Sequence, residues 1–409
     1  MEMEKNNDDE IVHPSKFIQV GCWNNLNKNK NNEEGCIKTV MKRIKSHIED
    51  EGKKTDFIVL SGDNYYPKKI KKDGEKKKII IKENLANGFK LLPDTLPIYM
   101  IMGNHDLETN KDKEELFVET GEEEEEAKEE VEKDCKIIDL EFESMKPNVE
   151  YNFFKDIMLK NGTLLLMIDT SIYEEDSEKY LPCYKKFFEK RVDKNIVKYD
   201  VSVLRNYQKH FINTSIENYS VKIKNIIIIG HHPIIYLRYK GGDDNETLSS
   251  IQEKFSPVLQ NIYQTVNNTK VKYYYLCSDL HLYQHGTIII PTINQKNKKT
   301  QMVINQYVVG TGGAELDDPL LRPDSDKNKK NLLNYQSDIS DMKYIVHEDI
   351  QACGFLVCDI LDKEGPTFTP ILFDKKGNKV NGGGSRKRRR MTKHKKLTKH
   401  KKRHYTKKI

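Results

Sequence analysis

Short apolar runs recur along the chain, and several of them end abruptly in Gly, Asp, Asn or His. Their length and their content of β-branched residues predict buried strands, and the polar residues at their ends predict loops. The six clearest runs are Phe17–Gly21, Phe57–Gly62, Ile98–Gly103, Leu164–Asp169, Ile226–Gly230 and Tyr273–Cys277. Between the first two, apolar residues from Ile37 to Ile48 recur at the spacing of one helical face. This alternation predicts an α/β sheet whose loops gather at the carboxyl ends of the strands.

Later apolar runs follow one another with little predicted helix between them. They are Thr287–Ile293, Gln301–Gly310, Gly354–Ile360 and Thr367–Phe373. We expect them to form a second, more antiparallel sheet that packs against the first.

Charged segments interrupt this pattern. Lysines crowd residues 68–82, and acidic residues crowd 119–133 within the stretch 107–135. Such segments cannot bury enough apolar surface to fold, so we expect both as disordered, solvated insertions rather than binding sites. The predicted organisation is a disordered N-terminus over 1–15, one domain over 16–378, and a Gly linker with a basic tail over 379–409.

The tail carries the excess positive charge. The net charge is +6, and residues 386–409 hold fourteen Lys or Arg and no acid. Subtracting fourteen from +6 leaves −8 for the rest of the chain, so the body is mildly acidic. This composition predicts contact with nucleic acid or another polyanion, a localisation signal, or a solubilising arm. Basic arms of this style, in a chain rich in Lys, Asn and Ile, resemble those of large DNA viruses.

The cysteines and the N-terminus bear on the compartment. Seven cysteines without a CxxC motif predict no disulfide framework and suit a reducing compartment. The polar, acidic N-terminus is unlike a signal peptide, and no apolar run approaches the ~20 residues of a membrane span. We therefore expect an intracellular protein, cytoplasmic or nuclear, or carried in a virion if viral, without membrane contact.

Five strand ends present residue types that bind metals. They are Gly21–Asn24, Gly62–Tyr66, Gly103–Asp106, Gly230–Pro233 and Cys277–His281. Each is weak evidence alone, because a lone Asp or His at a strand end is commonly a cap or a core residue. Five of them, each after a predicted buried strand, form a specific pattern.

In this pattern the chain resembles the calcineurin-like metallophosphoesterases, and among them most of all the purple (tartrate-resistant) acid phosphatases. The shared forms are GDNxY, GNHD, GH[YH]P and a last motif of the C-G-H-x-H type. The resemblance covers Lys16 to Phe373. It implies a four-layer α/β/β/α sandwich with a dinuclear metal site between two sheets, and it leaves the basic C-terminal tail outside as a disordered segment.

The resemblance also implies roles for individual residues. Asp63 would bridge the two metals, Tyr66 would bind ferric iron, and His281 would complete the first metal's ligands. Asn104 and His231 would bind the second metal. The metals would be two divalent or trivalent ions, iron paired with iron, zinc or manganese.

His105 is implied to stand beside the metals without binding them. There it would polarise the phosphate or protonate the leaving group. A hydroxide bridging the metals would attack the phosphate ester.

Two positions depart from the family pattern. Cys22 stands where the first motif carries Asp, and Asp279 stands where the last motif carries His. A thiolate and a carboxylate can both bind metals, and together they would add one negative charge to the site. The alternative is an eroded site in which Cys22 is a buried small residue and the first metal is weak or lost.

These observations favour metal-dependent hydrolysis of phosphoric esters by an enzyme resembling purple acid phosphatases, acting on phosphomonoesters. One alternative is a phosphatase or phosphodiesterase that the tail recruits to nucleic acid. Another is a catalytically impaired binding or packaging protein. The substrate, the metal pair and the oligomeric state remain open.

Overall fold

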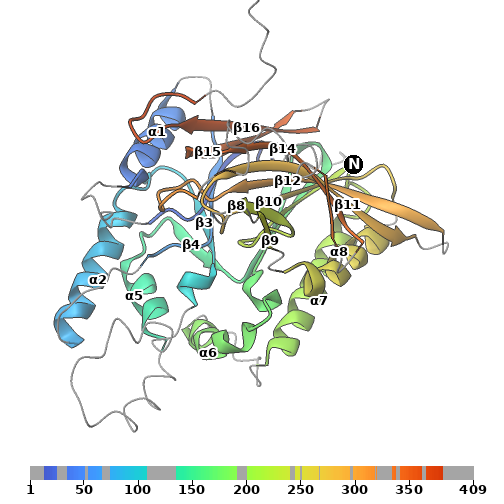
Figure 1. Cartoon of the computed structure of the whole chain (residues 1–409). Helices are drawn as coiled ribbons and strands as arrows, with labels where there is room; N and C mark the ends of the chain where they lie inside the picture. Colours follow the sequence, from blue (N-terminus) through green and yellow to red (C-terminus); the bar gives the residue numbers. More distant parts are fainter. Residues whose placement is uncertain are drawn as a thin grey trace, which may run out of the picture.

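The computed structural model describes most of the chain (Figure 1). The described residues are 13–24, 35–50, 54–66, 74–107, 135–190, 200–239, 245–248, 251–266, 268–294, 298–317, 319, 334–337, 341–361 and 365–380. The N-terminal residues 1–12, most of the acidic stretch and the tail from 381 lie outside this part, so the predictions for them stay untested.

A six-stranded sheet has the order β16-β15-β1-β2-β3-β4. Its strands are β1 (Lys16–Val20), β2 (Phe57–Ser61), β3 (Ile98–Ile101), β4 (Val149–Asn152), β15 (Cys353–Leu361) and β16 (Gly365–Phe373). Strands β1 to β4 run parallel, and β15 and β16 add to them in antiparallel pairing. The N-terminal strand therefore lies between β2 and a strand made more than three hundred residues later.

An eight-stranded sheet has the order β13-β14-β11-β12-β10-β7-β6-β5. Its strands are β5 (Phe154–Leu159), β6 (Thr163–Ile168), β7 (Asn225–Ile229), β10 (Lys272–Cys277), β11 (Tyr283–Ile293), β12 (Lys299–Val309), β13 (Asn334–Gln336) and β14 (Lys343–Ile350). A separate hairpin pairs β8 (Tyr236–Tyr239) with β9 (Asn245–Leu248).

All six predicted early strands and all four predicted later strands are present. Their division between the sheets is different from the prediction. Strands β6, β7 and β10 belong to the second sheet, and β15 and β16 to the first. The expectation that early and late strands form separate sheets is wrong because the chain crosses between sheets from β4 to β5 and again before β15.

Strands that are buried on both faces explain the continuous apolar runs. In β6, Leu164 and Leu166 pack into the larger core cluster, which includes the helices, while Leu165 and Met167 join a second cluster. The second cluster draws residues from both sheets, including Val59, so it lies between them. Alternate residues of one strand thus fill different layers.

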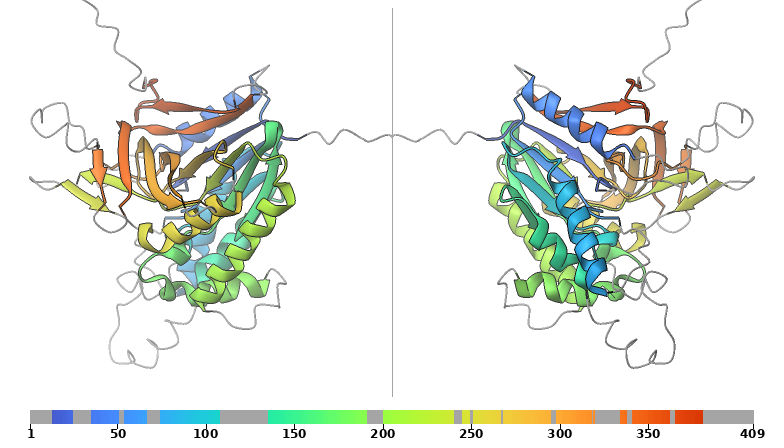
Figure 2. Two further views of the ribbon diagram at one scale, coloured as in Figure 1. Left: turned by 90° about the vertical axis from the view of Figure 1, so that its right-hand side faces the viewer. Right: turned by 90° about the vertical axis from the view of Figure 1, so that its left-hand side faces the viewer.

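Six α-helices complete the described part of the fold. They are α1 (Ile37–Glu49), α2 (Gly74–Phe89), α5 (Lys136–Ser144), α6 (Leu181–Lys190), α7 (Val201–Tyr219) and α8 (Gln252–Val266). Helices α1 and α2 lie on one side of the molecule and α7 and α8 on the opposite side, with the sheets between them (Figures 1 and 2). The predicted four-layer α/β/β/α sandwich is confirmed. No helix in the described residues is long and apolar enough to span a membrane.

The predicted helical face between the first two strands is also confirmed. Helix α1 buries Ile37, Val40, Met41 and Ile44. Disorder over 68–82, in contrast, is wrong for residues 74–82, because α2 begins at Gly74. The apolar residues that follow the lysines, such as Ile81 and Leu85, are buried in the core and hold the helix in place.

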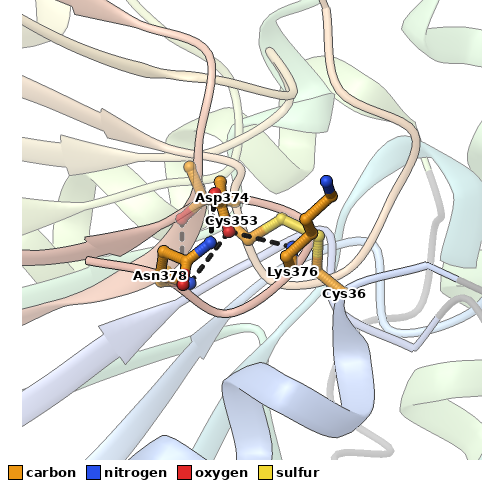
Figure 3. The surroundings of a disulfide bond; sticks show 7 residues. Cys36, Cys353, Asp374, Lys376 and Asn378 are labelled. Atoms are coloured by element: carbon orange, nitrogen blue, oxygen red, sulfur yellow. Dashed lines mark hydrogen bonds between the residues drawn. A yellow bond between two sulfur atoms is a disulfide. The ribbon is translucent and has the colours of Figure 1, made fainter. Parts of the chain in front are cut away.

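Four of the seven cysteines form two disulfide bonds, Cys36–Cys353 and Cys135–Cys183. The first joins the start of α1 to the start of β15, beside the turn in which Asp374 accepts the backbone N–H groups of Lys376 and Asn378 (Figure 3). The expectation that the cysteines form no disulfide framework is therefore wrong. Partners that are 317 and 48 residues apart meet only through the topology of the folded chain. The intracellular location itself stays a prediction.

Candidate metal centre

Three site residues share an uncommon backbone conformation. Cys22, Asp63 and Asp279 have φ values of 52°, 52° and 62°, in the left-handed region. Each lies just beyond the end of a buried strand, so the turn directs its side chain across the strand ends. Asp tolerates this conformation better than most residues, whereas for Cys it is unusual. Such outliers cluster at functional sites, where the surrounding structure holds them.

Glycines let the neighbouring loops approach closely. Gly62 has a φ of 90°, and a Cβ there would lie 2.3 Å from Nδ1 of His231. A Cβ on Gly103 would lie 2.4 Å from Oδ1 of Asp63. Gly62 therefore cannot be replaced without strain, both because of its positive φ and because the His231 ring packs against its Cα.

Asp63 lies at the centre of the site and is almost fully buried. Its Oδ1 accepts the backbone N–H of His105 at 3.1 Å and lies 3.2 Å from Nε2 of His231. Its Oδ2 accepts the phenol of Tyr66 at 2.9 Å. Burial raises the pKa of Asp63, but the charges of His231 and His105 outweigh it and hold that pKa well below its usual range. The carboxylate is ionised at neutral pH.

One group of donors combines Cys22, Asp63 and His281, whose ligand atoms all lie within 4.8 Å of one another. The Cys22 Sγ is 3.9 Å from Oδ2 of Asp63, and the Tyr66 hydroxyl is 3.0 Å from Nε2 of His281. Ligands that bind one zinc at 2.0–2.3 Å lie about 3–4 Å apart in tetrahedral geometry. The spacing and the mixture of sulfur, nitrogen and oxygen therefore fit a zinc or iron ion.

A second group of candidate ligands contacts Asp63 through His231. The ligand atoms of His231, His232 and Asp279 lie within 4.8 Å of one another. Nε2 of His231 is 3.1 Å from Oδ1 of Asn104 and 3.9 Å from Oδ1 of Asp279. Asp63 belongs to the first group and its Oδ1 contacts His231 of the second, so its carboxylate links the two groups.

Backbone carbonyls orient two of the imidazoles. Nδ1 of His231 donates to the carbonyl of Ser61 at 2.8 Å, and Nδ1 of His281 donates to the carbonyl of Glu315 at 2.8 Å. In each ring Nε2 is then left to contact the other candidate metal ligands. A histidine that binds a metal commonly uses its second ring nitrogen in this way, to donate a hydrogen bond. Burial lowers the pKa of His231, but Asp63 raises it to about 10, so the ring holds a proton that a cation would displace.

The Cys22 thiol depends on a cation to become a ligand. Burial and the negative charge of Asp63 raise the pKa of Cys22 well above its usual value. Without a positive ion the sulfur therefore stays protonated. A bound zinc or iron ion would reverse this balance, because metal binding deprotonates a coordinating thiol.

His105 lies at the edge of these donors. It belongs to the 3-10 helix η1 (Asn104–Asp106), and its Nε2 is 4.0 Å from Oδ2 of Asp63. Its side chain is one third exposed, unlike the buried Asp63 and His231. A side chain here can reach both the donors and a molecule that arrives from solvent.

The structure thus brings together all eight residues named from the sequence: Cys22, Asp63, Tyr66, Asn104, His105, His231, Asp279 and His281. Their roles as ligands stay predictions. The sequence did not single out Glu174, whose Oε1 lies 2.9 Å from Nε2 of His232. The hydroxyl of Thr170 meets the other nitrogen of this ring at 3.1 Å, so His232 is held from both sides. Glu174 belongs to none of the five sequence motifs, and it reaches His232 only through the folding of the chain.

Comparison with known proteins places these features in a wider group. A family model described as calcineurin-like phosphoesterase matches residues 15–283. No curated protein matches the chain. Among solved structures, the chain is similar to GAP50, the anchor in the inner membrane complex of Plasmodium, at 14% identity and a TM-score of 0.44. That likeness covers 90% of this chain and 88% of the other.

Proposed function

The chain belongs to the calcineurin-like phosphoesterase family, and from this premise we propose that it hydrolyses phosphomonoesters in the manner of the purple acid phosphatases. Family membership supports metal-dependent hydrolysis of phosphoric esters in general. The observation that carries the finer proposal is the position of Asp63, whose carboxylate belongs to one group of candidate metal ligands and contacts His231 of the other. A carboxylate in this position is what a two-metal phosphatase site needs.

The chain's own residues would divide the work as follows. Cys22, Tyr66 and His281 would hold one ion, and Asn104, His231 and Asp279 the other, with Asp63 between them. Two bound ions would neutralise the phosphate charge and supply a nucleophilic water near neutral pH. We expect iron or zinc rather than magnesium at Cys22, because thiolates select softer metals.

His105 would act on the leaving group. Its side chain reaches solvent while its backbone N–H is bound to Asp63, so the ring is held beside the donors. From there Nε2 can donate a proton to the ester oxygen as the P–O bond breaks, so that an alcohol leaves rather than an alkoxide.

The test measures metal content and hydrolysis on the full-length protein. Wild type and Asp63→Asn are purified, loaded with iron, zinc or manganese, and assayed with an aryl phosphate. We expect two ions per chain in wild type, and in the variant loss of at least one ion and of turnover by ~10³-fold or more. The matched control is Asp56→Asn. Asp56 precedes the same strand β2 at its other end, where it accepts the N–H groups of Ser15 and Lys16.

Turnover that survives Asp63→Asn, or wild type without turnover under any metal, would contradict the proposal. The second result would favour the binding or packaging protein.

The tail supports a second, compatible proposal, recruitment to nucleic acid. Residues 386–409 carry fourteen cationic side chains and no acid. Binding through such a segment is insensitive to sequence and falls steeply with salt, because each neutralised phosphate releases counterions. We expect deletion of residues 382–409 to abolish DNA and RNA binding at 0.1 M salt while turnover of the aryl phosphate is unchanged. Equal nucleic-acid affinity of the two proteins would exclude the tail as the binding segment.

A further inference from the structure

Each of the first three site loops carries a second polar side chain that the proposed chemistry does not use. They are Trp23 after Cys22, Asn64 after Asp63, and Asp106 two residues after Asn104. All three are at most 2% exposed. Buried polar groups are normally hydrogen-bonded, so the partners of these three residues reveal their role.

The three side chains bond to one another in a line. Nε1–H of Trp23 donates to Oδ1 of Asn64 at 2.9 Å. Nδ2–H of Asn64 donates to Oδ2 of Asp106 at 2.8 Å, and the backbone N–H of Asn64 donates to Oδ1 of the same carboxylate at 2.8 Å. The line therefore crosses from the loop after β1, over the loop after β2, to the loop after β3.

Further hydrogen bonds tie this line to the three loops. The carboxylate of Asp106 accepts the backbone N–H of Gly103 at 2.8 Å, which ties it to its own loop. The second Nδ2 hydrogen of Asn64 reaches the carbonyl of Ile101, at the end of β3, at 2.9 Å. Between the first two loops, the backbone N–H of Cys22 donates to the carbonyl of Gly62 at 3.1 Å.

The chemistry of the groups gives the line one direction. An indole N–H can only donate, and a backbone carbonyl such as that of Ile101 can only accept. The amide of Asn64 must therefore present its oxygen to Trp23 and its nitrogen to Ile101. This also places that nitrogen beside Asp106, and the amide has no satisfactory flipped orientation. Each member stands within two residues of a proposed metal ligand.

We propose that Trp23, Asn64 and Asp106 form a clamp, meaning this line of three hydrogen-bonded side chains, that sets the spacing of Cys22, Asp63 and Asn104. These are positioning residues, since all three are buried and none is among the candidate ligands. The clamp couples the two donor groups, because Cys22 belongs to one, Asn104 contacts the other, and Asp63 links them. The inference rests on the proposed metal centre, but the clamp itself is built without any ion.

The test uses two clamp variants and one control. Trp23→Phe removes the indole donor and keeps an aromatic ring, whereas Asn64→Leu removes the amide at similar volume. The control, Tyr173→Phe, also deletes one buried donor. The Tyr173 hydroxyl donates to Oε1 of Gln208 at 3.0 Å, and neither residue is a proposed ligand or a member of the line. If Asn64→Leu fails to fold, Trp23→Phe still decides the question.

The first readout is amide hydrogen exchange in the metal-free protein. The clamp predicts that Trp23→Phe, a change in the first loop, speeds exchange at the N–H groups of Asn64 and Gly103 at least fivefold. Tyr173→Phe should leave both rates within twofold of wild type. Acceleration confined to the first loop would overturn the inference even if the protein binds no metal.

The second readout is zinc binding, measured by competition with a chelator. We expect zinc affinity at least tenfold weaker in Asn64→Leu and threefold or more weaker in Trp23→Phe, with no change in Tyr173→Phe. Wild-type affinity in both folded clamp variants would overturn the inference. Absence of zinc from wild type itself would instead contradict the proposed function, and hydrogen exchange would then decide the clamp alone.

Discussion

Cys22 and Asp63 adopt the same left-handed backbone conformation, both at a φ of 52°, with the Cys22 sulfur 3.9 Å from the Asp63 carboxylate. They follow the parallel neighbours β1 and β2, so the same turn is repeated side by side. For a residue other than Gly, Asn or Asp, this conformation costs about 1–2 kcal/mol. Cys22 is therefore held in a conformation that its own backbone disfavours. Substitution of Cys22 beside Asp63 can therefore test the metal preference of the site.

Cys22→Asp should change metal preference without loss of stability. Asp accepts the left-handed conformation more readily, and its oxygen ligands suit harder cations than a thiolate does. We expect the ratio of cadmium to manganese affinity to fall by ~10²-fold or more, measured by competition titration. With cations bound, which offset the added negative charge, the free energy of unfolding should stay within about 1 kcal/mol of wild type.

The control for this change is Cys358→Ala, which removes a buried free thiol from the core between the sheets. It should lower stability but leave the metal ratio unchanged. If the ratio responds to Cys358→Ala and not to Cys22→Asp, then Cys22 does not bind metal.

Tyr66→Phe should weaken binding at the donor group of Cys22. The Tyr66 phenol contacts both Asp63 and His281, so it either binds the ion or orients two of its ligands. Loss of such a partner typically weakens metal affinity ~10–100-fold. The neighbouring Tyr65→Phe is the matched control, because Tyr65 is buried in the core and is not among the donors. Equal metal affinity in the two variants would count against a role for Tyr66.

The stability of the fold should depend on Asp169, a fully buried carboxyl beyond β6. Burial raises its pKa to about 6, although the Tyr184 hydroxyl, the Ser171 N–H and the charge of His232 act in the opposite direction. A raised carboxyl pKa means that the folded state favours the protonated form. The stability from this group is complete below pH 4 and is lost as pH rises through 6, a fall of about 3 kcal/mol.

Asp169→Asn should remove that fall. Urea denaturation of both proteins at pH 4, 5, 6 and 7 would measure it as a difference in slope between them. Parallel curves would show that Asp169 has the same proton affinity in the folded and unfolded states.

The disulfides should be detectable by counting thiols. Alkylation of the unfolded, unreduced protein should modify only Cys22, Cys277 and Cys358, and reduction should expose four more. The double variant Cys135→Ser/Cys183→Ser should lose about 4 kcal/mol of unfolding free energy, since the bridge closes a 48-residue loop. Seven labels before reduction would show that neither bridge forms under the conditions of expression.

The sequence predicts strands well here because most of them are buried on both faces and end in sharp polar turns. The same property predicts the site: Asp63 and Asn104 follow parallel neighbours, whose carboxyl ends meet at one edge. The partner of each strand is less predictable. The apolar sequence of β15 would be the same whether the strand paired with β1 or with β14. Only three-dimensional packing determines that it pairs with β1. The disulfides and the contact between Glu174 and His232 depend on that packing and leave no local signal.

The position of β1 has a consequence for synthesis of the protein. Its partner β15 begins at Cys353, 333 residues after Val20, the last residue of β1. At ~5–20 residues per second, a ribosome needs roughly 15–70 s to make that interval. Throughout this time one edge of β1 has no partner strand, and the Cys36–Cys353 disulfide cannot form because Cys353 has not yet been synthesised. An unpaired strand edge can pair wrongly with other chains, so this interval is when we expect chaperones to protect β1.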